Sequence, residues 1–327
     1  MNSTKSGTIR ISAIEISLPE SCVNIESYRP RFENFDLAVS RSGVTQKHVA
    51  GESETALDLA VNAFEKLEAR EPGTLASLDG IIFITQTPDY LFPGNSNLLM
   101  KRLGIEQNIL NYDLNQGCAG FVYGANLAQS MIATNQASTV ALICSDTYSK
   151  IISPDDRGTS LLFGDGCAVT IFSEEKGAFK LNGLAVRQLA RYADLFMVAD
   201  GAARDSYCSS APHIEMQGAA LLSVLATHAP DFMKKFLEDE GINKDDFDLV
   251  ICHQASRVAL DQIGKILGLP PSLMFRNIEN FGNTTCASIP IALWDALSKP
   301  ESSAYNKIFV FGFGVGFSMG AMNLERV

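Results

Sequence analysis

Cys118 is the residue best placed in this sequence for nucleophilic chemistry. In the segment NYDLNQGCAGF it follows a predicted strand that ends near Asn115, and a buried helix is expected to open at Ala119. A thiol at a helix N-terminus lies near free N–H groups and the positive end of the helix dipole, which favour the thiolate and lower its pKa. The same N–H groups can stabilise the oxyanion formed when the sulfur attacks a thioester. The competing interpretation is that Cys118 is a small, inert core side chain.

Two further segments supply partners for this thiol. His253 ends a predicted buried strand in VICHQAS, and Asn283 precedes a helix in NFGNTTCAS. The carboxyl ends of parallel strands face the crevice in which α/β proteins bind ligands. Taken alone, His253 fits a structural histidine and Asn283 fits a turn or N-cap residue. Together with a thiolate they form a coherent trio, in which two neutral donors hold the negative charge that develops on a carbonyl. Cys286 could also start a helix, so position alone does not choose between it and Cys118.

A glycine-rich segment, FGFGVGFSMG at Phe311–Gly320, lies near the C-terminus. Its glycines let the backbone approach a ligand closely. The spacing is not GxGxxG followed by a helix, so it does not predict a dinucleotide site. The backbone N–H of Val315 is a candidate second oxyanion donor beside that of Cys118.

The elements that must position these residues repeat along the chain. The segment KRLGI returns 164 residues later as KILGL, and apolar strand segments recur at similar separations. Each half is predicted to run strand, helix, strand, helix, strand, helix, strand, strand, and this alternation predicts an α/β protein with a mainly parallel sheet. The helix over 119–133 is apolar nearly all round, so it should lie between two sheets. We expect two pseudo-repeated α/β halves, residues 1–175 with the cysteine and residues 176–327 with the histidine and asparagine, in a layered α-β-α-β-α arrangement.

Composition excludes several functional classes. The chain has 26 Lys plus Arg against 37 Asp plus Glu, and this net charge of −11 argues against a nucleic-acid or membrane-surface binder. No segment predicts a membrane-spanning helix or a signal peptide. Seven cysteines without paired spacing favour a reducing cytoplasm over a disulfide framework. Four histidines without metal-ligand spacing predict no metal site. We therefore expect a cytoplasmic protein with no nucleic-acid, membrane or metal partner.

Five motifs in order along the whole chain resemble the thiolase-fold condensing enzymes, most closely the beta-ketoacyl-acyl-carrier-protein synthase III family. They are GCAGFVYG, SPDDRGTSLLFGDG, HQAS, GNTTCASIPIAL and GFGVGFSMGA. The resemblance implies a thiolase-like fold and an acyltransferase that is acylated on Cys118 by a primer thioester. His253 and Asn283 would promote decarboxylation of a malonyl-type thioester and stabilise its enolate. The backbone N–H groups of Cys118 and Val315 would form the oxyanion hole. The product would be a β-ketoacyl thioester for fatty-acid or specialised-metabolite biosynthesis.

The resemblance also implies substrates, partners and binding residues. The substrates would be an acyl-coenzyme A or acyl-carrier-protein primer and malonyl-carrier protein or malonyl-coenzyme A, with no other cofactor. The family forms homodimers in which an apolar residue, here Phe92, reaches into the acyl pocket of the other subunit. The implied coenzyme A contacts and channel residues are Arg41, Arg157, Phe163, Gly218, Ser256 and Phe313.

The chain departs from the family pattern at the coenzyme A end of the site. The family usually has a tryptophan before Arg41, whereas the only tryptophan here is Trp294. Ser256 stands where the family has an asparagine that steadies the pantetheine arm. These changes indicate a primer other than acetyl-coenzyme A or a specialised pathway. Two alternatives remain open, namely acyl transfer to an oxygen or nitrogen acceptor without decarboxylation, and a non-catalytic subunit of a heterodimer.

Overall fold

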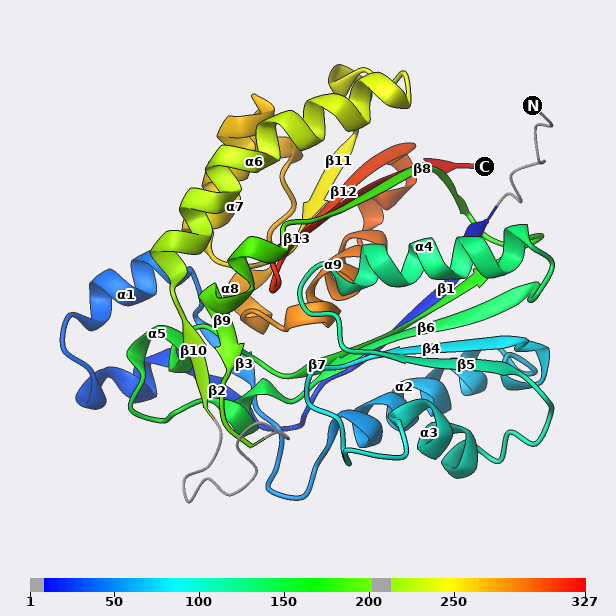
Figure 1. Cartoon of the computed structure of the whole chain (residues 1–327), viewed down its shortest axis with the longest axis horizontal. Coiled ribbons are helices and arrows are strands. Elements are labelled where there is room, and N and C mark those ends of the chain that lie inside the picture. The colour runs from blue at the N-terminus through cyan, green and yellow to red at the C-terminus, as the bar shows by residue number, and fades with distance from the viewer. Residues whose placement is uncertain (1–8, 202–212) are drawn as a thin grey trace.

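The computed structural model describes residues 9–201 and 213–327, and Figure 1 shows how their elements are arranged. The strands are β1 (Arg10–Ser17), β2 (Cys22–Asn24), β3 (Gln46–His48), β4 (Gly80–Ile84), β5 (Leu110–Leu114), β6 (Thr139–Asp146), β7 (Gly166–Ser173), β8 (Phe179–Gln188), β9 (Phe196–Val198), β10 (Ile214–Met216), β11 (Leu249–Cys252), β12 (Lys307–Gly314) and β13 (Ser318–Arg326). The helices are α1 (Phe35–Ser42), α2 (Ala56–Arg70), α3 (Asn95–Leu103), α4 (Gly120–Ala133), α5 (Arg157–Ser160), α6 (Gly218–Asp239), α7 (Arg257–Leu267), α8 (Ile278–Phe281) and α9 (Ser288–Leu297). None of the helices in the described ranges is long and apolar enough to cross a membrane.

The main sheet consists of two parts joined at a short seam. Its strand order is β11-β12-β13-β8-β1-β7-β6-β4-β5. At the seam, β1 and β8 pair over only two residue pairs, Arg10 with Lys180 and Ile11 with Phe179. The four strands on one side of the seam and the five on the other therefore form two sheets that can face each other.

Helices cover both sheets and fill the space between them (Figure 1). The side chains of β4 alternate: Ile81 and Phe83 pack under α2 and α3, whereas Ile82 and Ile84 face α4 and α9. On the other sheet, α6 and α7 pack on the outer face, and its inner face joins the core around α4. Gly120 and Gly124 let α4 approach closely, because a Cβ at Gly120 would lie 2.9 Å from the Ile84 side chain. The layers are those that the sequence predicted, α-β-α-β-α.

Two expectations about the strands were wrong. The sheet is mixed rather than mainly parallel, because only the pairs β4/β5, β4/β6 and β11/β12 are parallel. Three residues join β12 to β13 and reverse the chain, and β7 runs antiparallel to both of its neighbours. The second half also lacks its expected third strand, which is reduced to a single bridge between Val250 and Met274. The proposed boundary at residue 175 lies between β7 and β8, and the division into two repeated halves stays a prediction.

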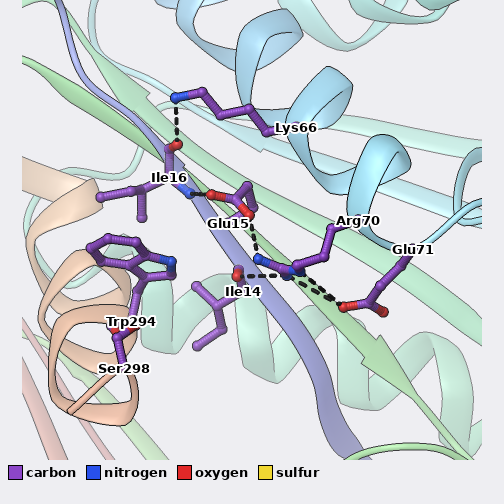
Figure 2. Close-up of polar contacts among 8 residues, drawn as sticks. All are labelled: Ile14, Glu15, Ile16, Lys66, Arg70, Glu71, Trp294 and Ser298. Atoms are coloured by element: carbon purple, nitrogen blue, oxygen red, sulfur yellow. Dashed lines mark hydrogen bonds and ion pairs between the residues drawn. The ribbon is translucent and has the colours of Figure 1, made fainter.

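An ion pair and hydrogen bonds connect α2 to β1 (Figure 2). Arg70 pairs with the Glu15 carboxylate and donates to the Ile14 carbonyl oxygen at 3.1 Å. Lys66 donates to the Ile16 carbonyl oxygen at 3.3 Å. Trp294, on α9, lies at the opposite side of the same strand and packs against the central core. The single tryptophan therefore supports the layered core.

Candidate active site

Cys118 stands at the turn between the edge strand β5 and the central helix α4. β5 ends at Leu114, and α4 begins at Gly120 with Ala119 as its N-cap residue. Gly314, at the end of β12, lies directly against the cysteine, since a Cβ there would be 2.5 Å from Cys118 Cβ and 2.9 Å from Sγ. The thiol therefore faces the glycine-rich turn between β12 and β13.

His253 and Asn283 come from the other half of the chain and line one cavity of about 310 Å³ together with Cys118. His253 follows β11, and its backbone N–H donates to the Phe311 carbonyl oxygen at 2.8 Å. Asn283 follows α8 and forms an isolated parallel bridge with Phe163. The structure thus brings the three candidate side chains to the same cavity, and all three are buried.

Six other residues expected to bind substrate line the same cavity: Arg41, Arg157, Phe163, Gly218, Ser256 and Phe313. The two arginines are exposed, whereas Cys118, His253 and Asn283 are buried. The cavity therefore leads from a cationic surface to the buried thiol. Ser256 is also the N-cap residue of α7.

Val315 and Phe92 are not among the described residues that line this cavity. The backbone N–H groups of Val315 and Cys118 both lower the pKa of the Cys118 thiol, so they lie near the sulfur and near the carbonyl that the sulfur would attack. Phe92 is 85% exposed in the loop between β4 and α3, beside Leu91, which is 86% exposed. Within one chain, Phe92 makes no contribution to the cavity.

The expected lowering of the Cys118 pKa was wrong. Burial, and next the charge of Asp146, raise the pKa of the thiol from 9.0 to about 12, and the N–H groups of Cys118 and Val315 offset only part of this. The sequence indicated the helix terminus but not how completely the sulfur is removed from water, and burial disfavours the charged thiolate. The free protein therefore holds Cys118 as a thiol at neutral pH.

The buried carboxylate of Asp146 accepts hydrogen bonds from two segments of the chain near the thiol. Asp146, at the end of β6, accepts hydrogen bonds from the Gln86 backbone N–H at 2.7 Å and from the Thr285 hydroxyl. The Cys286 sulfur lies 3.1 Å from the same carboxylate. Because Cys286 is engaged beside Asp146 and does not line the cavity, Cys118 is the better candidate nucleophile of the two.

Ser288 orients the His253 ring, a role that no sequence pattern indicated. Nδ1 of His253 lies 2.6 Å from Ser288 Oγ, and the Gln254 backbone N–H points to the same oxygen at 3.4 Å. Oγ accepts from Gln254, and among the described residues no acceptor other than Nδ1 is found for its own hydrogen. This network assigns the ring proton to Nε2. Burial lowers the pKa of His253 from 6.5 to about 3, so the ring is neutral near pH 7.

The side-chain amide of Asn283 is held at both ends. Its Oδ1 accepts from the Thr285 backbone N–H at 3.0 Å, and Nδ2 donates to the Ala255 carbonyl oxygen at 3.3 Å. One Nδ2 hydrogen remains for a ligand. Two neutral donors, Nε2–H of His253 and Nδ2–H of Asn283, are therefore available in the cavity that contains the thiol. The described residues include no group of three or more His, Cys, Asp or Glu side chains placed to hold a metal ion.

Comparisons with known proteins agree with this arrangement. Residues 112–187 match the family described as 3-oxoacyl-[acyl-carrier-protein (ACP)] synthase III, and residues 237–326 match the family of its C-terminal part. The chain is 30% identical over 294 residues to beta-ketoacyl-[acyl-carrier-protein] synthase III of Oleidesulfovibrio alaskensis, across 88% of this chain and 89% of that one. It is 31% identical over 288 residues to the protein of that name from Coxiella burnetii, with the same coverage of 88% and 89%. A 3-oxoacyl-(acyl-carrier-protein) synthase III crystal structure matches with a TM-score of 0.90 at 28% identity, over 98% of this chain and 100% of the other.

Proposed function

The chain belongs to the 3-oxoacyl-[acyl-carrier-protein] synthase III family of thiolase-fold enzymes, and we propose that it uses Cys118, His253 and Asn283 to carry out that family's reaction. It is an acyltransferase that condenses an acyl thioester primer with a malonyl-type thioester, with loss of carbon dioxide, to give a β-ketoacyl thioester. The observation that carries the residue assignment is that these three buried side chains line one cavity. The similarity of the whole chain to a solved synthase III structure confirms the predicted thiolase-like fold.

In the first step, the Cys118 sulfur attacks the carbonyl carbon of the primer thioester. The carbonyl oxygen becomes an oxyanion, which accepts hydrogen bonds from the backbone N–H groups of Cys118 and Val315. The cysteine gives its proton to solvent as it attacks, and the tetrahedral intermediate then expels the donor thiolate, which takes up a proton from solvent. Because the pKa of Cys118 is raised to about 12, the thiol loses this proton during the attack and not beforehand. One oxyanion donor is typically worth about 3–4 kcal/mol of barrier.

In the second step, the malonyl-type thioester binds beside the acyl-cysteine. Its thioester oxygen accepts hydrogen bonds from Nε2–H of His253 and Nδ2–H of Asn283. As the carbon–carbon bond to the carboxylate breaks, the electron pair moves into an enolate whose charge these donors stabilise. The enolate carbon attacks the acyl carbonyl, and collapse of that intermediate releases the cysteine thiolate, which is reprotonated. A neutral, buried histidine suits this role, because it donates a hydrogen bond without adding a charge.

The exposed arginines at the mouth of the cavity fit an anionic carrier. Arg41 and Arg157 line the cavity at its exposed end, and phosphate groups are the usual ligands of such side chains. The primer and extender are carried by coenzyme A or acyl-carrier protein, both of which end in a phosphorylated pantetheine arm. No cofactor beyond these two thioesters takes part in the proposed steps. A cytoplasmic location stays a prediction.

The protein works as a homodimer in this proposal. The edge strand β5 pairs with β4 alone among the described strands, so its other side can join a second sheet. Tyr90, Leu91 and Phe92 are 62%, 86% and 85% exposed, and such an apolar group on a surface is typical of an interface. These features support a dimer in which Phe92 serves the acyl site of the other subunit.

Product analysis with matched variants tests the proposed function. The purified protein is supplied with an acyl thioester and malonyl-carrier protein or malonyl-coenzyme A, and the β-ketoacyl product and carbon dioxide are measured. Asn283→Ala should abolish carbon dioxide release and still allow Cys118 to be acylated, whereas Asn182→Ala, at an exposed asparagine, should match the wild type. Acyl transfer without carbon dioxide release in the wild type would instead favour an oxygen or nitrogen acceptor.

A further inference from the structure

Lys47 is a buried cation next to residues that line the active-site cavity, and the steps above give it no role. It lies on β3 and is 2% exposed. Its Nζ donates hydrogen bonds to the carbonyl oxygens of Ser160 at 2.7 Å and of Phe163 at 2.8 Å. It also lies 5.3 Å from the centre of the Tyr28 ring. Two carbonyl dipoles and one aromatic face therefore surround the ammonium group.

The two carbonyl groups belong to a segment of the cavity wall. Leu161, Leu162 and Phe163 all line the cavity that contains Cys118. Ser160 is the last residue of α5, where carbonyl groups have no partner within the helix. Lys47 thus binds this wall segment, residues 160–163, at both of its ends.

The wall segment also holds Asn283. The Asn283 backbone N–H donates to the Leu162 carbonyl oxygen at 2.9 Å, and the Gly164 N–H donates to the Asn283 carbonyl oxygen at 3.1 Å. The carbon stem of Lys47 packs on both sides of this bridge, because a Cβ at Gly164 or at Gly282 would lie 3.3 Å from Lys47 Cβ. The backbone position of Asn283 therefore depends on the segment that Lys47 binds.

The charge on Lys47 strengthens this connection. Hydrogen bonds from a charged donor are roughly twice as strong as those between neutral groups. A neutral amine could still donate to both carbonyl groups, but it would hold them less firmly. Because a shift of about 1 Å in a reacting group can cost about 100-fold in rate, a looser wall segment would weaken the bond from Asn283 Nδ2 to the extender.

We propose that Lys47 is a positioning residue for the condensation step: its protonated amine holds the wall segment, and through it Asn283, where Nδ2 donates to the extender. The proposal rests on the role of Asn283 proposed above. Acylation of Cys118 does not use Asn283, so it should not depend on Lys47.

The charge of Lys47 is lost at moderately alkaline pH. Burial lowers the pKa of Lys47 from 10.5 to about 8, and the charge of Asp165 offsets only part of this. The ammonium form is therefore present below pH 8 and is lost above it. Burial raises the pKa of Tyr28 above its usual 10, so the phenol keeps its proton in this range. The other ionisable side chains on the elements around Lys47 are Cys22, Glu26, Arg29, Arg31, His48, Asp156, Arg157 and Glu279.

A single-turnover experiment on the wild type tests the proposal without any variant. Protein acylated on Cys118 is freed of excess thioester and mixed with malonyl-coenzyme A or, separately, malonyl-carrier protein, and release of carbon dioxide is followed between pH 7 and pH 9.5. We expect the rate constant at saturating extender to fall about tenfold with an apparent pKa near 8. A rate that stays level or rises up to pH 9.5 overturns the proposal.

Two variants connect the pH profile to Lys47. Lys47→Met keeps most of the carbon stem and removes the donor, so condensation at saturating extender should fall about tenfold at pH 7, with acylation of Cys118 within about threefold of the wild type. Lys47→Arg keeps the charge at all these pH values, so it should restore condensation and remove the fall above pH 8. The control is Lys66→Met, at a lysine that donates to the Ile16 carbonyl oxygen at 3.3 Å and lines no part of the cavity. It should match the wild type in both steps.

The outcomes separate this proposal from the proposed function. Normal condensation in Lys47→Met, or a fall above pH 8 that persists in Lys47→Arg, overturns the positioning role alone. If the wild type is not acylated, or releases no carbon dioxide from the malonyl thioesters at any pH, the proposed function fails and the positioning role fails with it.

Discussion

The contact between Gly314 and Cys118 allows a sharp prediction for Gly314→Ala. A Cβ at this position would lie 2.5 Å from Cys118 Cβ and 2.9 Å from Sγ, whereas carbon atoms in contact prefer about 3.5–4.0 Å. An overlap of about 1 Å must push the sulfur away from the Val315 N–H. A misplacement of about 1 Å can cost a reaction about 100-fold, and overpacking a core typically costs about 1–3 kcal/mol. We expect acylation of Cys118 to fall about 100-fold and stability to fall by about 2 kcal/mol.

The control for this prediction is Gly264→Ala in α7. A Cβ there has only an ordinary contact, 3.8 Å from a Met274 side-chain atom. Alanine also favours a helix over glycine by up to about 1 kcal/mol. This variant should acylate like the wild type and be slightly more stable. The assays are the acylation rate, from intact-protein mass, and thermal unfolding. Acylation of Gly314→Ala within threefold of the wild type would refute the claim that the sulfur is positioned by this glycine.

Three other predictions concern the buried groups of the site. The pKa of Cys118 is about 12, so its alkylation by iodoacetamide should rise about tenfold per pH unit from pH 7 to 10; a plateau below pH 9 would contradict the raised pKa. The pKa of His253 is about 3 in the folded protein, against 6.5 for a free histidine side chain. As the pH falls below 6.5, only the unfolded chain takes up a proton at this residue, and this uptake lowers the free energy of unfolding. Urea unfolding should therefore show that the wild type loses about 2 kcal/mol more than His253→Gln between pH 7 and pH 5, and equal losses would show that the histidine is not buried as described. Ser288→Ala removes the hydroxyl 2.6 Å from His253 Nδ1, so condensation should fall at least tenfold while Cys118 acylation persists; normal condensation would exclude a positioning role for Ser288.

The layered fold was predictable because it depends on patterns within single segments. The all-round apolar character of α4 placed it between two sheets, and the structure has it there. The expectation of a mainly parallel sheet failed because alternation of strands and helices does not report how β1 and β7 insert between the other strands. Strand direction is decided by pairing between distant segments, which a single sequence does not display.

The meeting of the candidate site residues in one cavity was predictable, whereas the pKa of the thiol was not. The positions of Cys118 and His253 at the ends of strands indicated that they would meet, and both line one cavity. The pKa of the thiol was predicted in the wrong direction, because burial exceeds the effect of the helix terminus. Ser288 was missed because its role comes from a contact across 35 positions of the chain.

The most direct test of the central claim is the mass of the intact protein after incubation with a panel of acyl thioesters, with Cys118→Ala as the control. The account predicts that the wild type gains the mass of one acyl group, that Cys118→Ala gains none, and that malonyl-carrier protein or malonyl-coenzyme A then removes the group as a β-ketoacyl thioester. Acylation that persists in Cys118→Ala, or no acylation by any carrier or coenzyme A thioester, would contradict the assignment of Cys118 as the nucleophile.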